Sequence, residues 1–163
     1  MKHSAGIHKS VIAIDPGYDR LGVAVLADDG TLLTSECFSP NSKIFTERLL
    51  QIKNRIRELV ETHHPSSLAL ETLFFSKNQK TALKVAEARG VIIVLSAELE
   101  LPLYEYSPQA VKIAVTGSGN ADKTSVIKMV ERLVKLAPQK RQDDEYDAIA
   151  LGIAHQASFT FKR

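Results

Sequence analysis

The chain has 163 residues, of which 44% are hydrophobic and 25% charged, and its net charge is +2. This length and composition fit one compact domain and argue against a second, while the mildly basic balance permits nucleic acid as a partner. Cys37 is the only cysteine, which excludes an intramolecular disulfide and a cysteine-based zinc site. No apolar run reaches the roughly 18 residues of a membrane span, and the first residues lack the apolar core of a signal peptide. We expect a cytoplasmic protein with a flexible tail at residues 1–10 and a single domain at residues 11–160.

Three strands are predicted near the N-terminus. The alternating, β-branched run at residues 11–15, VIAID, ends at a Pro-Gly turn. Residues 21–38 contain two more strands, which form an antiparallel hairpin around the turn at residues 28–30. A helix is predicted from about residue 41 to about residue 63, because apolar side chains recur there every three or four residues. A fourth strand, SLALE, follows at residues 67–71.

One further strand lies among the helices of the second half. Ser76 and Gln79 have the spacing of a capping box, and the helix that they open is predicted to extend to about Glu98. The segment LPLYEY, residues 101–106, predicts a short strand. Ser107 then precedes a proline, which is typical of a helix start.

Two more helices complete the predicted chain. One presents a single apolar face formed by Val126, Met129, Val130 and Leu133. The other extends from about residue 144 to about residue 158. Three consecutive strands, followed by helices that alternate with strands, predict an α/β fold in which a mixed five-stranded sheet carries helices on its faces.

Four acidic residues occupy the ends of predicted elements. Asp15 ends the first strand and Glu71 ends the fourth, whereas Asp144 and Asp147 lie one turn apart at the start of the last helix. Binding sites form outside strand ends in open sheets, and carboxylates at positions i and i+3 share a helix face. Four carboxylates that meet in space repel one another unless cations neutralise them.

All four side chains would offer only oxygen atoms as ligands, which indicates the kind of metal that they would bind. Hard oxygen ligands select Mg²⁺ or Mn²⁺. Two such ions about 3.5 to 4 Å apart activate a water molecule and stabilise the leaving oxygen when a phosphodiester is cleaved. The pattern therefore favours a metal-dependent nuclease with two ions in its active site.

Each candidate also has a structural interpretation. Asp15 could cap the Pro-Gly turn that follows it, and Glu71 could be an ordinary strand-end acid. The acidic cluster at residues 143–145 fits the positive end of a helix dipole. His155 lies on the stripe that begins at Asp144, two turns beyond the acids, and is a candidate either for contact with metal, water or phosphate or for a structural role.

Five blocks of sequence resemble one known family. They are IDPG at residues 14–17, ETLFFSKNQKTALKVAEARG at 71–90, EYSPQAVK at 105–112, GSGNADKTSVIKMV at 117–130 and DDEYDAIALGIAH at 143–155. They follow the family's order and cover most of residues 11–158. On these blocks the chain resembles the RuvC-type Holliday junction resolvases.

The resemblance implies a fold, an activity and a set of site residues. The fold is ribonuclease-H-like, and the protein is a homodimer in which each subunit nicks one of two opposed strands of a four-way DNA junction, using divalent metal, during recombination and repair. The residues that match the family's metal-binding carboxylates are Asp15, Glu71, Asp144 and Asp147. His155 falls where some members have a histidine near the active site, and Lys112 and Lys123 match basic positions implicated in catalysis and junction binding.

The segment after Glu71 predicts DNA contacts. Phe74 matches the family's aromatic residue that enters the junction and stacks on an unpaired base, a contact worth about 1 to 3 kcal/mol. Phe75 points either to DNA or into the protein, and hydrophobic contact with the next helix could explain both rings. Lys77, Lys80 and Lys84 form one basic stripe that suits phosphate contacts or is simply a solvated helix face.

The resemblance also implies protein partners. In the family the helix that Ser76 opens here lies at the dimer interface, which implies interface roles for Ala82, Ala86 and Gly90 or their neighbours. Packing of these small residues on the sheet is the alternative. A branch-migration helicase assembly accompanies resolvases of this family and is a possible partner.

Other functions stay open at this point. The segment after IDPG, YDRLGVAVL, is closer to the YqgF family, so the chain could be a YqgF-like nuclease that acts on RNA or on a replication intermediate. A junction-binding module that does not cut is another alternative, although the four acids would repel phosphate without metal. Actin-like ATPases and sugar kinases share an Asp-x-Gly motif, but they need two domains and this chain has room for one.

Overall fold

The computed structural model describes residues 10–73, 79–136 and 139–160. Its centre is a five-stranded sheet in the order β3-β2-β1-β4-β5. The strands are β1 (Val11–Asp15), β2 (Leu21–Leu26), β3 (Leu32–Phe38), β4 (Ser67–Glu71) and β5 (Leu103–Tyr106). Strand β2 pairs antiparallel with β1 and β3, whereas β4 pairs parallel with β1 and β5. The predicted mixed sheet is therefore confirmed, as is the hairpin of β2 and β3.

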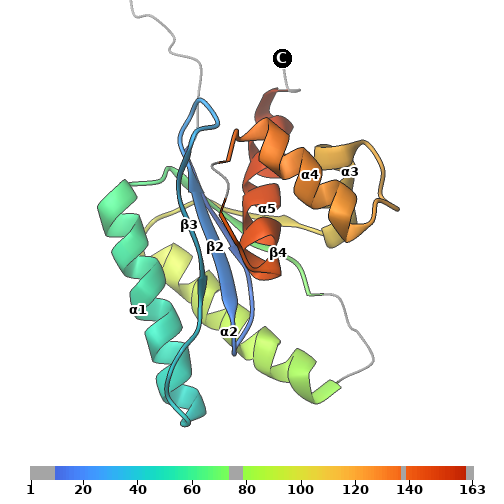
Figure 1. Ribbon diagram of the computed structural model, residues 1–163. Coiled ribbons are helices and arrows are strands. Elements are labelled where there is room, and N and C mark those ends of the chain that lie inside the picture. The colour runs from blue at the N-terminus through green and yellow to red at the C-terminus, as the bar shows by residue number, and fades with distance from the viewer. Residues whose placement is uncertain (1–9, 74–78, 137–138, 161–163) are drawn as a thin grey trace, which may run out of the picture.

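Helices cover both faces of this sheet (Figure 1). On one face lie α1 (Phe45–His63) and α2 (Gln79–Glu98), and on the other lie α3 (Pro108–Thr116), α4 (Lys123–Leu133) and α5 (Asp143–Thr160). The predicted α/β architecture is confirmed. Within the described residues, no helix is both long enough and apolar enough to cross a membrane.

Side-chain alternation along β1 and β4 divides the core into two halves. Even-numbered residues of these strands pack against α1 and α2: Ile12, Ile14, Leu68 and Leu70. Odd-numbered residues pack against α5 and its neighbours: Val11, Ala13 and Ala69. Successive side chains of a strand point to opposite faces, so Asp15 and Glu71 both point to the face that α5 covers.

Helix α1 begins at Phe45, about four residues later than predicted. The residues before it form a hydrogen-bonded turn instead, in which the Ser42 hydroxyl accepts a bond from the Ile44 amide at 3.0 Å and donates one to Glu47 at 2.6 Å. Serine side chains compete with the helix for such backbone groups. Apolar periodicity therefore indicated the helix correctly but not its first residue.

The predicted start of α3 is confirmed. The Ser107 hydroxyl accepts a hydrogen bond from the backbone of α3 at 3.1 Å, and a proline occupies the first turn. Helix α2 is described from Gln79 onward, and Ser76, the predicted cap that opens it, lies outside the described residues. The tail predicted at residues 1–10 also lies outside them, apart from its last residue.

Candidate active site

Two of the predicted acids meet at the ends of neighbouring parallel strands. Strands β1 and β4 run in register up to Ile14 and Leu70, so Asp15 and Glu71 follow side by side. Burial raises the pKa of Asp15 to about 9, with the negative charge of Glu71 as the next cause, and burial also raises the pKa of Glu71. The two carboxyl groups are hydrogen-bonded to each other, which requires one proton between them.

Helix α5 brings the other two acids to the same point because Gly22 has no side chain. Gly22 lies opposite Asp15 in the β1–β2 ladder, and a Cβ at this position would stand 1.9 Å from the Asp144 backbone oxygen. The first turn of α5 therefore rests directly on the sheet beside Asp15. Asp144 and Asp147 lie close enough for their charges to raise the pKa of Asp15 further, after burial and Glu71. The structure thus brings together all four acids that the sequence predicted.

Two cations partly offset the four acids. Lys123 at the start of α4 places its Nζ 2.5 Å from an oxygen of Asp147, and the Arg20 Nε lies 3.1 Å from Asp144. Burial raises the pKa of Asp147, although the bond from Lys123 opposes that shift. Lys123 therefore contacts one of the four acids, and its predicted catalytic role stays a prediction. Lys112 lies on α3, and no contact found among the described residues joins it to the acids.

Glu145 also lies in the first turn of α5, and its contacts give it a structural role. Glu145 is buried, accepts a hydrogen bond from the Ser35 hydroxyl at 2.6 Å and pairs with Arg141 at 3.2 Å. The Cys37 thiol donates to Asp144 at a sulfur–oxygen distance of 3.7 Å. Burial raises the pKa of Cys37 to about 11, so the thiol stays neutral and can serve as this donor. The Ser35–Glu145 and Cys37–Asp144 hydrogen bonds fix α5 against β3.

The structure does not bring His155, a predicted catalytic residue, to the acids. The ring is buried, with Nε2 2.9 Å from the Ser67 hydroxyl and Nδ1 2.9 Å from the Tyr106 hydroxyl. Ser67 begins β4 whereas Glu71 ends it, which separates the two by about 13 Å along the strand. His155 is a hydrogen-bonded core residue and is not part of the proposed site.

The predicted DNA-contact segment is only partly described. Phe74, Phe75 and Lys77 lie outside the described residues, as does the side chain of Lys80. The Lys84 Nζ lies 4.9 Å from the centre of the Tyr18 ring and 5.8 Å from that of Phe45. A cation over two aromatic faces gains about 0.5 to 1 kcal/mol at an exposed site. Lys84 therefore ties α2 to the β1–β2 turn, in addition to any contact with phosphate.

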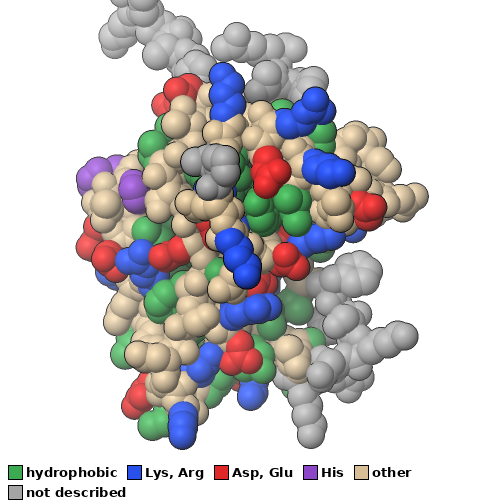
Figure 2. All heavy atoms as spheres, in the orientation of Figure 1, with side chains coloured by type: hydrophobic (Ala, Val, Ile, Leu, Met, Phe, Trp, Pro, Cys, Tyr) green, Lys and Arg blue, Asp and Glu red, His purple; other side chains and the backbone are tan. Residues whose placement is uncertain are grey.

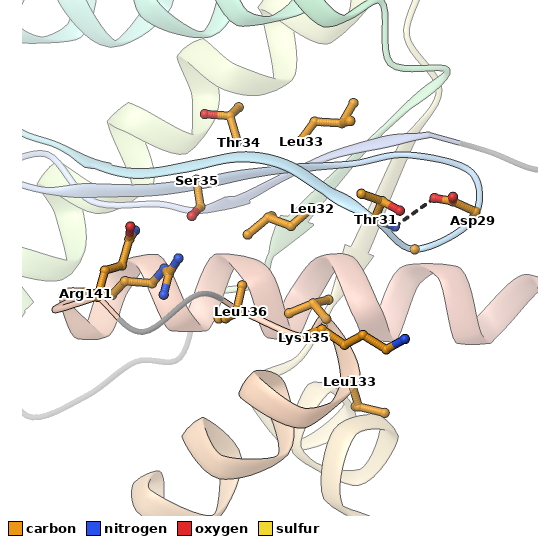
Figure 3. Close-up of a pocket in the computed structure, with 13 residues that line it drawn as sticks. Asp29, Thr31, Leu32, Leu33, Thr34, Ser35, Leu133, Lys135, Leu136 and Arg141 are labelled. Atoms are coloured by element: carbon orange, nitrogen blue, oxygen red, sulfur yellow. Dashed lines mark hydrogen bonds between the residues drawn. The ribbon is translucent and has the colours of Figure 1, made fainter.

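A pocket of about 620 Å³ lies away from the acids, between β3 and the segment after α4 (Figure 3). Its lining includes Leu32 and Thr34 of β3 and Leu136 and Arg141 of the α4–α5 connection. None of the predicted site residues is among the described residues that line it. The four acids, and not this pocket, therefore carry the candidate chemistry.

Gly22→Ala is expected to displace α5 and to destabilise the protein by roughly 1 to 3 kcal/mol. The added methyl would collide with the Asp144 backbone, which cannot move without lifting the acids from β1. Thermal unfolding of the variant and wild type measures the loss. An unchanged unfolding midpoint would show that α5 does not sit on the sheet at Gly22.

The donor set fits divalent metal. All four side chains are hard oxygen donors, and burial raises the pKa of Asp15, Glu71 and Asp147, a cost that a bound cation would remove. Among the described residues no group of three or more ligand side chains is already arranged around one point. Asp144 and Asp147 are paired with Arg20 and Lys123, so cation binding requires these two partners to be exchanged.

Comparison with known proteins identifies the family of the chain. The family model "Crossover junction endodeoxyribonuclease RuvC" matches residues 11–155. Relatives of that name include one from Roseiflexus sp. (strain RS-1), 42% identical over 148 residues and 88% of each chain, and one from Moorella thermoacetica, 42% identical over 153 residues and 91% of each chain.

A solved structure extends the likeness to the fold. Thermus thermophilus RuvC in complex with Holliday junction substrate superposes with a TM-score of 0.85 at 33% identity, covering 91% of this chain and 93% of that one. The match confirms the ribonuclease-H-like fold that the sequence blocks implied. The chain therefore belongs to the RuvC family of crossover junction endodeoxyribonucleases.

Proposed function

We propose that this protein resolves four-way DNA junctions by paired, metal-dependent hydrolytic nicks in opposed strands, in the cytoplasm, during recombination and repair. One observation carries the proposal: four carboxylates from β1, β4 and α5 meet at one edge of the sheet, and burial raises the pKa of three of them. Membership of a family of endodeoxyribonucleases supports DNA hydrolysis as the reaction.

Mg²⁺ or Mn²⁺, with two ions in each site, is the proposed cofactor. When bound, two such ions supply activation of water and stabilisation of the leaving oxygen. Asp15 is the carboxylate whose pKa the other three acids all raise, so it would be the central ligand of the bound metal. Glu71, Asp144 and Asp147 complete the ligand set.

Lys123 is proposed to act on the phosphate as well as on Asp147. In the metal-free site its ammonium group neutralises Asp147 at 2.5 Å. With a cation held by Asp147, the Lys123 ammonium would be available to offset the negative charge that develops on the scissile phosphate. We assign Lys112, on the neighbouring helix α3, a similar charge-balancing or junction-binding role on the family resemblance.

The attraction for DNA is proposed to be local. On the face shown in Figure 2, Lys and Arg side chains are interspersed with Asp and Glu side chains, as suits a net charge of +2. On this face the cations form no broad basic surface, so we assign the phosphate contacts to individual cations, Lys112, Lys123 and Lys84. Phe74 remains the proposed stacking residue, with Phe75, Lys77 and Lys80 beside it, all on the resemblance alone.

A binding and cleavage comparison tests the proposal against its alternatives. The protein is mixed without metal with a four-way DNA junction, a linear duplex and an RNA–DNA hybrid, and Mg²⁺ is then added. We expect preferential binding of the junction and nicking after Mg²⁺ addition. Preference for the hybrid would favour a YqgF-like activity on RNA, and tight junction binding without nicks would favour a non-cutting module.

A homodimer is proposed through an exposed apolar face of α2. Leu83, Gly90 and Val94 are spaced by seven and four residues and share one side of the helix. Leu83 is 66% and Val94 is 58% exposed, and nothing lies within 4 Å of a Cβ added at Gly90. Ala82, one of the predicted interface residues, is instead buried within the chain. A second copy would cover this face; a helicase partner rests on the resemblance alone.

Val94→Asp is expected to convert the dimer into a monomer with little change in monomer stability, since the side chain is exposed in the single chain. Leu50→Asp is the matched control, because Leu50 is 56% exposed on α1, away from this face. Light scattering should give the 18.0 kDa monomer for the first variant and twice that mass for the control. A dimer retained by Val94→Asp would place the interface elsewhere.

A further inference from the structure

The backbone carbonyl of Glu71 lacks a donor from the sheet. The amides of Leu68 and Thr72 donate to carbonyls of β5 and its preceding residue, so the backbone groups of Glu71, at the alternate position, face β1. Continuing the observed β1–β4 register sets the nitrogen of Pro16 opposite that carbonyl. Proline carries no N–H. The backbone hydrogen-bond ladder between β1 and β4 therefore lacks its last bond, which would be made at Glu71, a candidate metal ligand.

Arg89 supplies a donor at this position from the other side of the sheet. It lies on α2, and its Nη1 donates to the Glu71 carbonyl while its Nη2 pairs with the Glu105 carboxylate of β5. The Arg89 side chain is only 12% exposed, so water competes little for these bonds. A planar guanidinium holds its two donors in a fixed relation. Arg89 therefore bridges the C-terminal end of β4 and β5.

We infer that Arg89 is a positioning residue that fixes Glu71 for metal binding by replacing the donor that Pro16 lacks. It contacts the Glu71 backbone, not its carboxylate, and so acts through the orientation of that side chain. Groups that orient a metal ligand typically change metal affinity 10- to 100-fold when they are removed. The inference rests on the proposed function, because it requires Glu71 to be a ligand.

Calorimetric titration with Mn²⁺, on the full-length protein without DNA, tests the inference. Arg89→Gln is expected to raise the Mn²⁺ dissociation constant by about 10- to 100-fold. A purely electrostatic role predicts the opposite sign, because removal of a positive charge near the acids tightens cation binding. Arg57→Gln is the matched control: Arg57 pairs α1 with Glu98 of α2 at 2.7 Å and is 35% exposed, remote from the acids. This control should bind Mn²⁺ as wild type does.

Two further variants keep the inference testable if Arg89→Gln does not fold. Glu105→Gln removes the anchor of the guanidinium on an exposed side chain and should weaken Mn²⁺ binding in the same direction by a smaller factor. Pro16→Ala restores a backbone donor opposite Glu71. In the Pro16→Ala background, Arg89→Lys should reduce Mn²⁺ affinity by a smaller factor than it does in wild type. Equal reductions in both backgrounds would contradict the inference that Arg89 replaces the donor that Pro16 lacks.

The outcomes separate this inference from the proposed function. If wild type fails to bind Mn²⁺, the metal site itself is wrong, and the inference falls with it. If wild type binds Mn²⁺ and Asp15→Asn does not, the site stands. Unchanged or tighter binding by Arg89→Gln and by Glu105→Gln would then overturn the role of Arg89 alone.

Discussion

Asp15→Asn is expected to abolish nicking of a four-way junction while junction binding is retained. Asp15 is the carboxylate whose pKa the other three acids all raise, and an amide there contributes one neutral oxygen in place of a charged carboxylate. Loss of a group that merely orients a ligand lowers activity 10- to 100-fold, so loss of the ligand itself should cost at least about 100-fold. Nicking rates at saturating Mg²⁺ and gel-shift binding without metal measure the two effects separately.

Asp28→Asn is the matched control for this substitution. Asp28 is an exposed carboxylate in the turn between β2 and β3, and its loss alters the net charge by the same amount. Nicking by this control should equal that of wild type. Substantial nicking by Asp15→Asn, or a parallel loss of junction binding, would contradict direct metal ligation by Asp15.

The metal-free protein is expected to lose stability relative to Asp15→Asn as pH rises from about 4 to about 9. The pKa of Asp15 is raised from 3.8 to about 9 by burial and by the charge of Glu71. In this window the folded state holds a proton that the unfolded state has released, so folding becomes less favourable as pH rises. The stabilisation that this proton contributes to the folded state is fully present below pH 3.8 and is lost as the pH approaches 9.

The size of this effect follows from the linkage between protonation and folding. One pKa unit corresponds to about 1.4 kcal/mol, so between pH 5 and pH 8 we expect the difference to grow by on the order of 4 kcal/mol, or roughly 8 to 16 °C in the unfolding midpoint. Thermal scans of wild type, Asp15→Asn and Asp28→Asn in chelator at pH 5 and pH 8 measure it. A gap between wild type and Asp15→Asn that does not widen with pH would show that Asp15 is not buried among acids. Added Mn²⁺ should close the gap.

Local patterns predicted most of the fold for physical reasons that are visible in particular residues. Short apolar runs that end in an acid predicted β1 and β4, because each strand is buried on both sides and Asp15 and Glu71 mark their ends. The sequence could not show that these two ends are neighbours, since that depends on the parallel pairing of β1 with β4. The resemblance to a known family supplied that connection.

His155 shows where periodicity fails. It shares a helical stripe with Asp144, but eleven residues of helix correspond to about 16 Å along the axis. That length takes the stripe across the sheet to Ser67, at the opposite end of β4 from Glu71. A shared face of a helix therefore does not imply a shared site.

Three site residues escaped the sequence analysis. Gly22 carried a usable signal, because an isolated glycine inside a strand indicates close approach of another backbone. Arg20 and Arg89 carried none, since their partners Asp144 and Glu71 are distant in sequence. Arg89 also comes from the helix layer on the far side of the sheet, so only the three-dimensional arrangement brings it to the site.

Cleavage of a synthetic four-way junction tests the central claim most directly. Two opposed strands carry different end labels, Mg²⁺ or Mn²⁺ starts the reaction, and a linear duplex of the same sequence is treated in parallel. We expect paired nicks at symmetric positions in the junction, none in the duplex, and none in chelator. Nicks that occur equally in the duplex, or that persist without divalent metal, would contradict a metal-dependent centre that is selective for junctions.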